Sequence, residues 1–142
     1  MQAIHGHLHE WNRALSRVEL RADRLTLAKR RWRGVAEDGC EFGFDLEHSL
    51  HDGDVFFENE SVVYMVVQKS EVVLELRIAD CGLRKAALIA WMIGNLHFQI
   101  EFDEETIRVA DDLALRQMFE REHLKFVERA AVFHPISGGH HH

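Results

Sequence analysis

Apolar and polar side chains alternate through the first half of the chain. Apolar residues recur at every second position in three stretches, and residues 62–67 form a continuous run with almost no polar side chain. The alternating positions are Val18 and Leu20, then Leu25 and Leu27, then Phe42, Phe44 and Leu46. A period of two is typical of strands with one buried face, and a short apolar run is typical of a buried strand. The pattern predicts a small β domain, arranged as a sandwich or partial barrel.

Three polar segments separate these expected strands. Asp38-Gly39 and Asp52-Gly53 carry a residue pair that favours tight turns, and residues 58–61 (Glu-Asn-Glu-Ser) are a third turn candidate. Short strands joined by tight turns support the assignment of this half to the β class.

The pattern changes near residue 70, where helical and strand periods begin to alternate. Six elements are expected, at residues 71–78, 83–93, 98–102, 106–109, 112–122 and 125–133. Their order, β-α-β-β-α-β, is that of the ferredoxin-like unit. We therefore expect an α+β protein with three parts: a small N-terminal all-β domain (1–69), a ferredoxin-like domain (70–136) and a His-containing tail (137–142).

The helix expected at residues 83–93 is apolar on almost every side. Arg84 and Lys85 are its only polar residues. A sheet covers one face of a helix, so the second apolar face must pack against something else, and another copy of the same helix is the simplest candidate. The sequence therefore predicts a homodimer with this helix at or near the interface.

Charge and cysteine content narrow the class of protein. The 142 residues include 17 Lys and Arg against 24 Asp and Glu, a net charge of −7, which argues against binding to nucleic acid. The basic run at residues 29–33 has the residue types that bind an acidic or RNA partner, but a solvated strand face is the favoured interpretation. Cys40 and Cys81 form no CxxC pair, and the longest apolar run, at residues 86–93, is too short to cross a bilayer. We expect a cytoplasmic protein without a membrane anchor.

No catalytic signature is present in the chain. The motifs of serine hydrolases, zinc proteases, P-loop proteins and dinucleotide-binding proteins are all missing. The paired carboxylates Asp111-Asp112 and Glu104-Glu105 lie where a helix N-cap and a hairpin turn are expected. We expect no enzyme, and a metal-dependent hydrolase has no support from any motif.

Histidine is the unusual residue type, and it is concentrated at both ends of the chain. His5, His7 and His9 lie near one end, and His140, His141 and His142 at the other. Imidazole suits nickel, copper and zinc, and alternate residues of an extended segment share a face, so the first three could bind one ion. A solvated terminus that binds metal weakly is the alternative. The C-terminal histidines are either a natural metal-binding tail or a purification tag.

His97 has a different setting, because it follows the apolar helix. Gly94-Asn95 is a C-cap signal for that helix, and two-fold symmetry across it would bring together the His97 side chains of two chains. The alternative is an ordinary structural histidine. His123 has an ordinary role as a cation at a helix C-terminus, and His134 precedes the only proline, close to the tail.

The segment around His97 resembles a known family. Residues 91–97 (Trp-Met-Ile-Gly-Asn-Leu-His), followed by Gln99-Ile100-Glu101, resemble the Gly-Asn-Arg-His segment of UreE-type urease accessory proteins. The resemblance runs from about residue 18 to residue 134. It includes segments of the β half at residues 24–27, 29–33, 38–39, 42–43 and 52–55.

This resemblance implies a function, a metal and partners. It implies a homodimeric nickel metallochaperone that delivers Ni(II) to urease together with the urease accessory GTPase and the urease activation complex. The motif histidine corresponds to His97, which would bind the ion at the dimer interface. The weaker ligand candidates are His134, the three N-terminal histidines and the three C-terminal ones. Zn(II) or Cu(II) could replace nickel in vitro.

The chain departs from the family pattern at three places. Leu96 replaces the motif arginine, Met92 stands where many members carry histidine, and residues 111–113 (Asp-Asp-Leu) replace a His-x-His. An interaction or scaffold protein with a degenerated metal site is therefore the alternative function.

Overall fold

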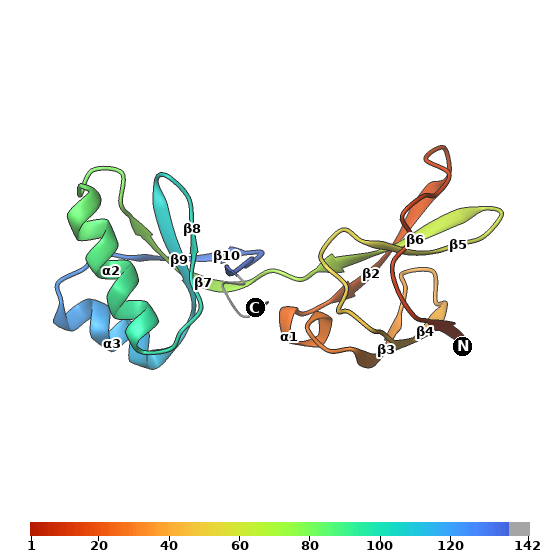
Figure 1. Ribbon diagram of the computed structural model, residues 1–142, viewed down its shortest axis with the longest axis horizontal. Coiled ribbons are helices and arrows are strands. Elements are labelled where there is room, and N and C mark those ends of the chain that lie inside the picture. The colour runs from red at the N-terminus through yellow and green to blue at the C-terminus, as the bar shows by residue number, and fades with distance from the viewer. Residues whose placement is uncertain (137–142) are drawn as a thin grey trace. The chain divides into compact units, whose positions relative to one another are not determined.

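The computed structural model describes residues 1–136, and its chain divides into two compact units (Figure 1). We call Met1–Lys69 the N-terminal unit and Ser70–His142 the C-terminal unit. Both contain helix and strand, so the protein is a mixed α+β protein with several sheets and small helices. Within residues 1–136, no helix combines the length and hydrophobicity needed to span a membrane.

The N-terminal unit contains two three-stranded sheets. In the first, the order is β1 (Gln2–Ile4), β4 (Glu41–Asp45) and β3 (Arg31–Val35). In the second, the order is β2 (Ser16–Ala22), β6 (Val62–Gln68) and β5 (Val55–Glu58). The pairs β1–β4 and β2–β6 are parallel, and the hairpins β3–β4 and β5–β6 are antiparallel.

Aromatic side chains fill the core of this unit. Phe42 and Phe44 lie two residues apart on β4 and are both buried, as their alternation predicts. The Phe42 ring contacts Phe56 and Tyr64 edge to face, with ring centroids 4.9 Å apart in each pair. Trp32 stacks on Phe44 with centroids 4.0 Å apart. These contacts between different strands join the two sheets into one core.

The predicted turns are present, and their residues explain them. Gly39 and Gly53 both have φ of +90°, a region that favours glycine. Asn59 Oδ1 accepts hydrogen bonds from the N–H groups of Ser61 and Val62, each at 2.8 Å, and so closes the β5–β6 hairpin. All three turn predictions are confirmed.

The prediction of a strand around Leu25 and Leu27 is wrong. Residues Arg24–Leu27 form the short helix α1. Asp23 caps it, because its Oδ1 accepts a hydrogen bond from Thr26 N at 2.8 Å. This capping bond holds one helical turn, and only Leu27 of the turn is buried. A local side-chain bond therefore outweighs the apolar alternation, and the unit is not purely β.

The C-terminal unit has one four-stranded antiparallel sheet in the order β10-β7-β9-β8. Along the chain the elements are β7 (Glu71–Arg77), α2 (Leu83–Asn95), β8 (Glu101–Phe102), β9 (Thr106–Ala110), α3 (Leu113–Arg121) and β10 (Val127–Ala131). The third and sixth elements are shorter than expected, because residues 98–100 and both ends of 125–133 lie outside the strands. Both helices pack on one face of the sheet (Figure 1).

The paired acidic residues of this unit lie where they were expected, Asp111-Asp112 at the start of α3 and Glu104-Glu105 in the β8–β9 turn. Asp112 caps α3, with its Oδ1 accepting from Ala114 N at 2.8 Å. Asp111 pairs with Arg116 at 2.7 Å, and this guanidinium lowers the pKa of the Asp111 carboxyl. The Asp103 carboxylate accepts from the N–H groups of Glu105 and Thr106, which shapes the β8–β9 turn.

Candidate metal centre

One face of α2 is apolar and exposed. Ile89 and Ile93 point into the core of the C-terminal unit and are buried. On the other side, Leu88 is 53% exposed, Trp91 63% and Leu83 86%. The prediction that the sheet covers only one side of this helix is therefore confirmed, and a second copy of the chain on the other side stays a prediction.

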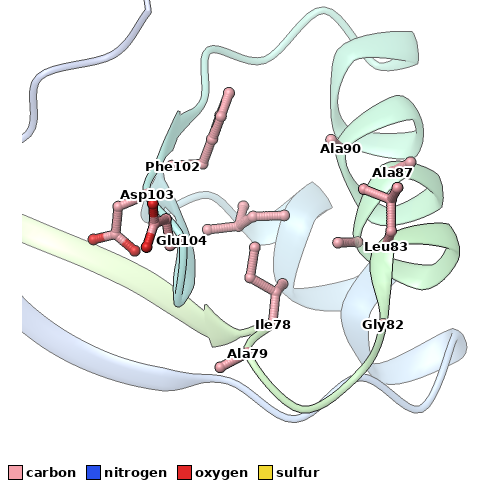
Figure 2. A pocket seen from close by; sticks show the side chains of 11 residues that line it. Ile78, Ala79, Gly82, Leu83, Ala87, Ala90, Phe102, Asp103 and Glu104 are labelled. Carbon is pink, nitrogen blue, oxygen red and sulfur yellow. The ribbon is translucent and has the colours of Figure 1, made fainter.

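A cavity of about 620 Å³ lies beside α2, between the helix and the β8–β9 hairpin. Its walls are mostly apolar, and Figure 2 shows Leu83 and Ala87 of α2 across from Phe102. Asp103 and Glu104 form an acidic edge on the hairpin side. The cavity adds to the apolar surface that this side of the unit presents.

His97 ends α2 in an unusual backbone conformation. Its φ is +65°, in the left-handed region that favours glycine. The His97 N–H donates to Gly94 O at 2.9 Å, and the Phe98 N–H donates to Ile93 O at 3.3 Å. This pair of bonds is the Schellman motif, with Leu96 as the C-cap and His97 in the position that glycine usually fills.

The C-cap prediction at Gly94-Asn95 is therefore displaced. The helix includes both residues, ends at Asn95 and has Leu96 as its C-cap. His97 directly follows the C-cap, so its backbone is fixed by the two bonds of the motif. Its side chain is exposed and makes no hydrogen bond or ion pair with any residue in the described part of the chain. The imidazole is available for a ligand.

His123 ends α3 in the same way, which the sequence did not indicate. Its φ is +56°, its N–H donates to Glu120 O at 3.1 Å, and the Leu124 N–H donates to Phe119 O at 2.8 Å. Two Schellman motifs of this unit thus carry histidine. The left-handed conformation alone cannot identify a metal ligand, because both helix ends have it.

The N-terminal histidines do not form the expected set of three ligands. The segment is not extended, because the chain bends at Gly6 and His9. The His5 ring nitrogen Nδ1 donates to Asp45 O at 3.1 Å, while the rings of His7 and His9 contact each other. Within residues 1–136, no group of three or more His, Cys, Asp or Glu side chains is arranged to hold a metal ion.

The C-terminal candidates lie close to the end of the described chain. His134 is exposed, and His140, His141 and His142 are outside the described residues. The Ile136 N–H donates to Ile100 O at 2.8 Å. The last described residue therefore lies beside the segment that follows His97.

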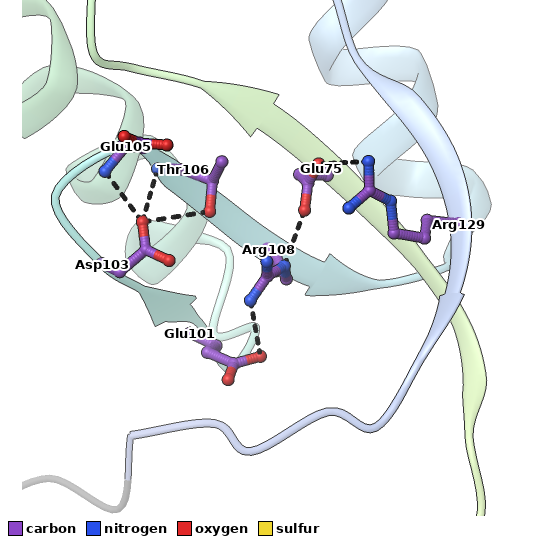
Figure 3. A network of polar contacts seen from close by, with 7 residues as sticks. All are labelled: Glu75, Glu101, Asp103, Glu105, Thr106, Arg108 and Arg129. Carbon is purple, nitrogen blue, oxygen red and sulfur yellow. Dashed lines mark hydrogen bonds and ion pairs between the residues drawn. The ribbon is translucent and has the colours of Figure 1, made fainter.

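A buried carboxylate on β7 organises the sheet, and sequence reasoning missed it. Glu75 is 8% exposed, and its two oxygens pair with Arg108 at 2.7 Å and Arg129 at 3.3 Å (Figure 3). The hydrogen bond from Arg108 to Glu75 raises the pKa of this guanidinium. Arg108 also lies 4.0 Å from Glu101, which is too long for a hydrogen bond. The network joins β7, β9 and β10, and at its edge the Glu101 Oε1 atom is buried and accepts no hydrogen bond within the described residues.

Residues 71–142 match the family model described as "UreE urease accessory protein, C-terminal domain", which is more than half of the chain. The match assigns the chain to the urease accessory proteins, which are not enzymes. Within that class, the chain belongs to the UreE family.

Several proteins named "Urease accessory protein UreE" are similar to this chain. The one from Bacillus cereus is 29% identical over 109 residues, which cover 75% of this chain and 70% of the relative. The one from Nitrosococcus oceani is 32% identical over 112 residues, covering 74% and 65%. The one from Pseudomonas fluorescens is 29% identical over 137 residues, covering 91% and 81%. Against some relatives the chain spans less than two thirds of their length, 61% for that of Beijerinckia indica.

Proposed function

We propose that this protein is a nickel metallochaperone that delivers Ni(II) to apo-urease and holds the ion between two copies of the chain through His97 of each. The ferredoxin-like region 70–136 would bind metal and form the dimer, and region 1–69 would contact partners. The observation that carries the proposal is an exposed apolar helix face that ends in an exposed histidine with a free imidazole.

The apolar face supports a dimer through α2. Leu88 and Trp91 expose large apolar side chains on the side of the helix away from the core. Removing apolar surface from water is worth about 25 cal/mol per Å², so covering these residues would stabilise an assembly. A two-fold contact buries the same patch twice, and an axis close to the end of α2 would bring both His97 side chains to one ion.

Two imidazoles leave coordination positions for other ligands, and the chain has candidates. Because Ile136 is bonded to Ile100, a histidine four residues further on could reach about 14 Å from that anchor. His140, His141 and His142 fall at or just beyond this point of the sequence but outside the described residues. His134 is a further candidate. His5, His7 and His9 lie in the N-terminal unit and remain weaker candidate metal ligands in that unit. A ligand that can leave its coordination position suits an ion that must be released.

Family membership supports the proposed metal and partners. Imidazole sites bind Cu(II) more tightly than Ni(II), so Cu(II) and Zn(II) should also bind in vitro, and nickel selectivity would come from geometry and supply. Under this proposal the protein acts in the cytoplasm with the urease accessory GTPase and the urease activation complex.

Calorimetric titration with Ni²⁺ tests the proposal, using the full chain and a chain truncated after Ile136. We expect one ion per two chains, lost in His97→Ala and kept in His123→Ala. His123 is the matched control because it has the same backbone motif at the end of the other helix. Loss of nickel binding in both variants, or retention of nickel binding in both, would contradict the proposed site at His97. Nickel binding by the full chain but not by the truncated chain would assign metal capture to residues 137–142.

The alternative, a scaffold protein with a degenerated metal site, also has structural support. Met92 packs against the core, Asp111 pairs with Arg116 and Asp112 caps α3, so these positions have structural roles. Partner binding that is equal with and without Ni²⁺, together with no nickel binding by the dimer, would favour this function.

A further inference from the structure

His7 and His9 lie side by side in the N-terminal unit. Their ring centroids are 4.6 Å apart, with an angle of 66° between the ring planes. Both residues are exposed, while Leu8 between them is partly buried. The bent chain therefore directs two imidazoles to one place on the surface.

The backbone holds this pair in position. The Leu8 N–H donates to Val55 O on β5 at 2.7 Å. A few residues later, the Asn12 N–H donates to the Glu58 carboxylate at 2.7 Å, again on β5. The segment is fixed to the sheet on both sides of His9, so the two rings do not depend on a free chain end for their proximity.

The ring separation matches that of two imidazoles on one ion. With a metal–nitrogen distance of about 2.0–2.1 Å, two rings bound at right angles have centroids roughly 4.5 Å apart. The observed 4.6 Å is close to this value. Both side chains are exposed, so turning the nitrogens toward a shared ion requires only rotation about side-chain bonds.

We propose that His7 and His9 form a two-imidazole site for a divalent transition-metal ion of the nickel, copper and zinc class. Water would complete the coordination, so the ion would exchange readily. One ion would bind per chain, which distinguishes this site from an interface site that holds one ion per two chains.

His5 does not belong to this site, although the alternation of the three histidines suggested that it would. Its Nδ1–H is bonded to the Asp45 carbonyl on β4, in the other sheet. No group of three potential ligands occurs in the described part of the chain.

Site-resolved titration of the full chain with Cu²⁺ alone tests the proposal. Copper is the probe because imidazole sites bind it most tightly and because it broadens NMR signals of nearby nuclei. We expect the amide signals of residues 7–10 to broaden at low equivalents. His7→Ala and His9→Ala should each weaken this effect at least tenfold, and the double variant should abolish it.

Two controls make the result specific. The pair His48→Ala and His51→Ala removes two other exposed imidazoles, and we expect the broadening at residues 7–10 to remain. It should also remain in His97→Ala, so failure of the interface site and failure of this site are distinguishable. No broadening at residues 7–10 in the parent, or broadening that survives the double variant, would overturn the proposal. An equal loss in His5→Ala would overturn the assignment to a pair.

Discussion

The ends of α2 and α3 share a backbone motif and differ in their surroundings. Each helix ends in a Schellman motif with a left-handed histidine. On α3, Leu115, Met118 and Phe119 are buried, and most of the outer side is polar. On α2, the outer side carries exposed Leu88 and Trp91. The two helix ends therefore differ in the exposed apolar face of α2 and not in the left-handed histidine. That face is what distinguishes the candidate metal centre at the end of α2 from the helix end of α3.

The largest expected effect is a loss of stability on the buried face of α3. Phe119 is fully buried against the sheet, so Phe119→Ala should destabilise the C-terminal unit by about 3–5 kcal/mol. Hydrogen exchange of the β7 and β9 amides would measure this. Trp91→Ala should leave the same amides nearly unchanged in the monomer, because Trp91 is largely exposed. If Trp91→Ala and Phe119→Ala reduced the protection of these amides equally, the exposed face of α2 and the buried face of α3 would not differ in their contribution to stability.

The dimer should depend on the exposed face of α2 alone. Trp91→Glu places a charge in the proposed interface and should weaken self-association by at least about 2 kcal/mol, or about thirtyfold. Sedimentation across a concentration series would measure this, with Gln117→Glu on the exposed side of α3 as the control. A parent chain that stays monomeric at all concentrations would contradict the dimer itself.

The beginnings of the two helices also differ. Asp112 caps α3, whereas Gly82 gives α2 no side-chain cap. Asp112→Ala should cost about 1 kcal/mol of unfolding free energy in the C-terminal unit, and Asp112→Asn should recover most of it. Urea denaturation would detect the loss. A similar loss in Asp112→Asn would point to charge rather than capping.

Replacing the left-handed histidines should separate strain from function. Glycine adopts this conformation without the steric cost, so His97→Gly and His123→Gly should each stabilise the protein by roughly 0.5–1 kcal/mol. Only His97→Gly should also lose the interface metal. Nickel titration beside urea denaturation measures both quantities, and destabilisation by either change would contradict the expected relief of strain.

The smallest effect concerns pH and the Asp111–Arg116 pair. Arg116 lowers the pKa of Asp111 in the folded protein, so the pair stabilises the fold above the ordinary Asp pKa. This contribution is lost as pH falls through the lowered value. Asp111→Asn should therefore reduce the acid sensitivity of the C-terminal unit below about pH 4. Thermal unfolding between pH 2 and 7 would show it, and an unchanged profile would exclude a contribution from the pair.

Local signals in the sequence predicted much of the fold. The period of two in β4, the Asp-Gly turns and the Asp112 cap act through neighbouring residues and could be recognised without coordinates. The helix at Arg24–Leu27 was missed because one capping bond outweighed an apolar alternation of only two positions. Short patterns carry little information when a local hydrogen bond competes with them.

Features that depend on distant residues could not be predicted. Glu75 is buried because Arg108 and Arg129, on two other strands, pair with its carboxylate. The position of His97 after an apolar helix was recognised, but its left-handed backbone depends on where α2 ends, which packing decides. The arrangement of the N-terminal histidines could not be predicted because it depends on the bends at Gly6 and His9.

The hydrogen bond between Ile136 and Ile100 has a consequence for any ligand carried further along the chain. A side chain attached a few residues beyond a fixed point has an effective concentration on the order of millimolar or higher near that point. A histidine there would bind an ion held by His97 as if free imidazole were supplied at that concentration. This applies whether the histidine is natural or part of a purification tag. Under the proposed function, ion capture by such a histidine would be an intramolecular equilibrium, and removing the hydrogen bond between Ile136 and Ile100 would weaken it without altering any ligand.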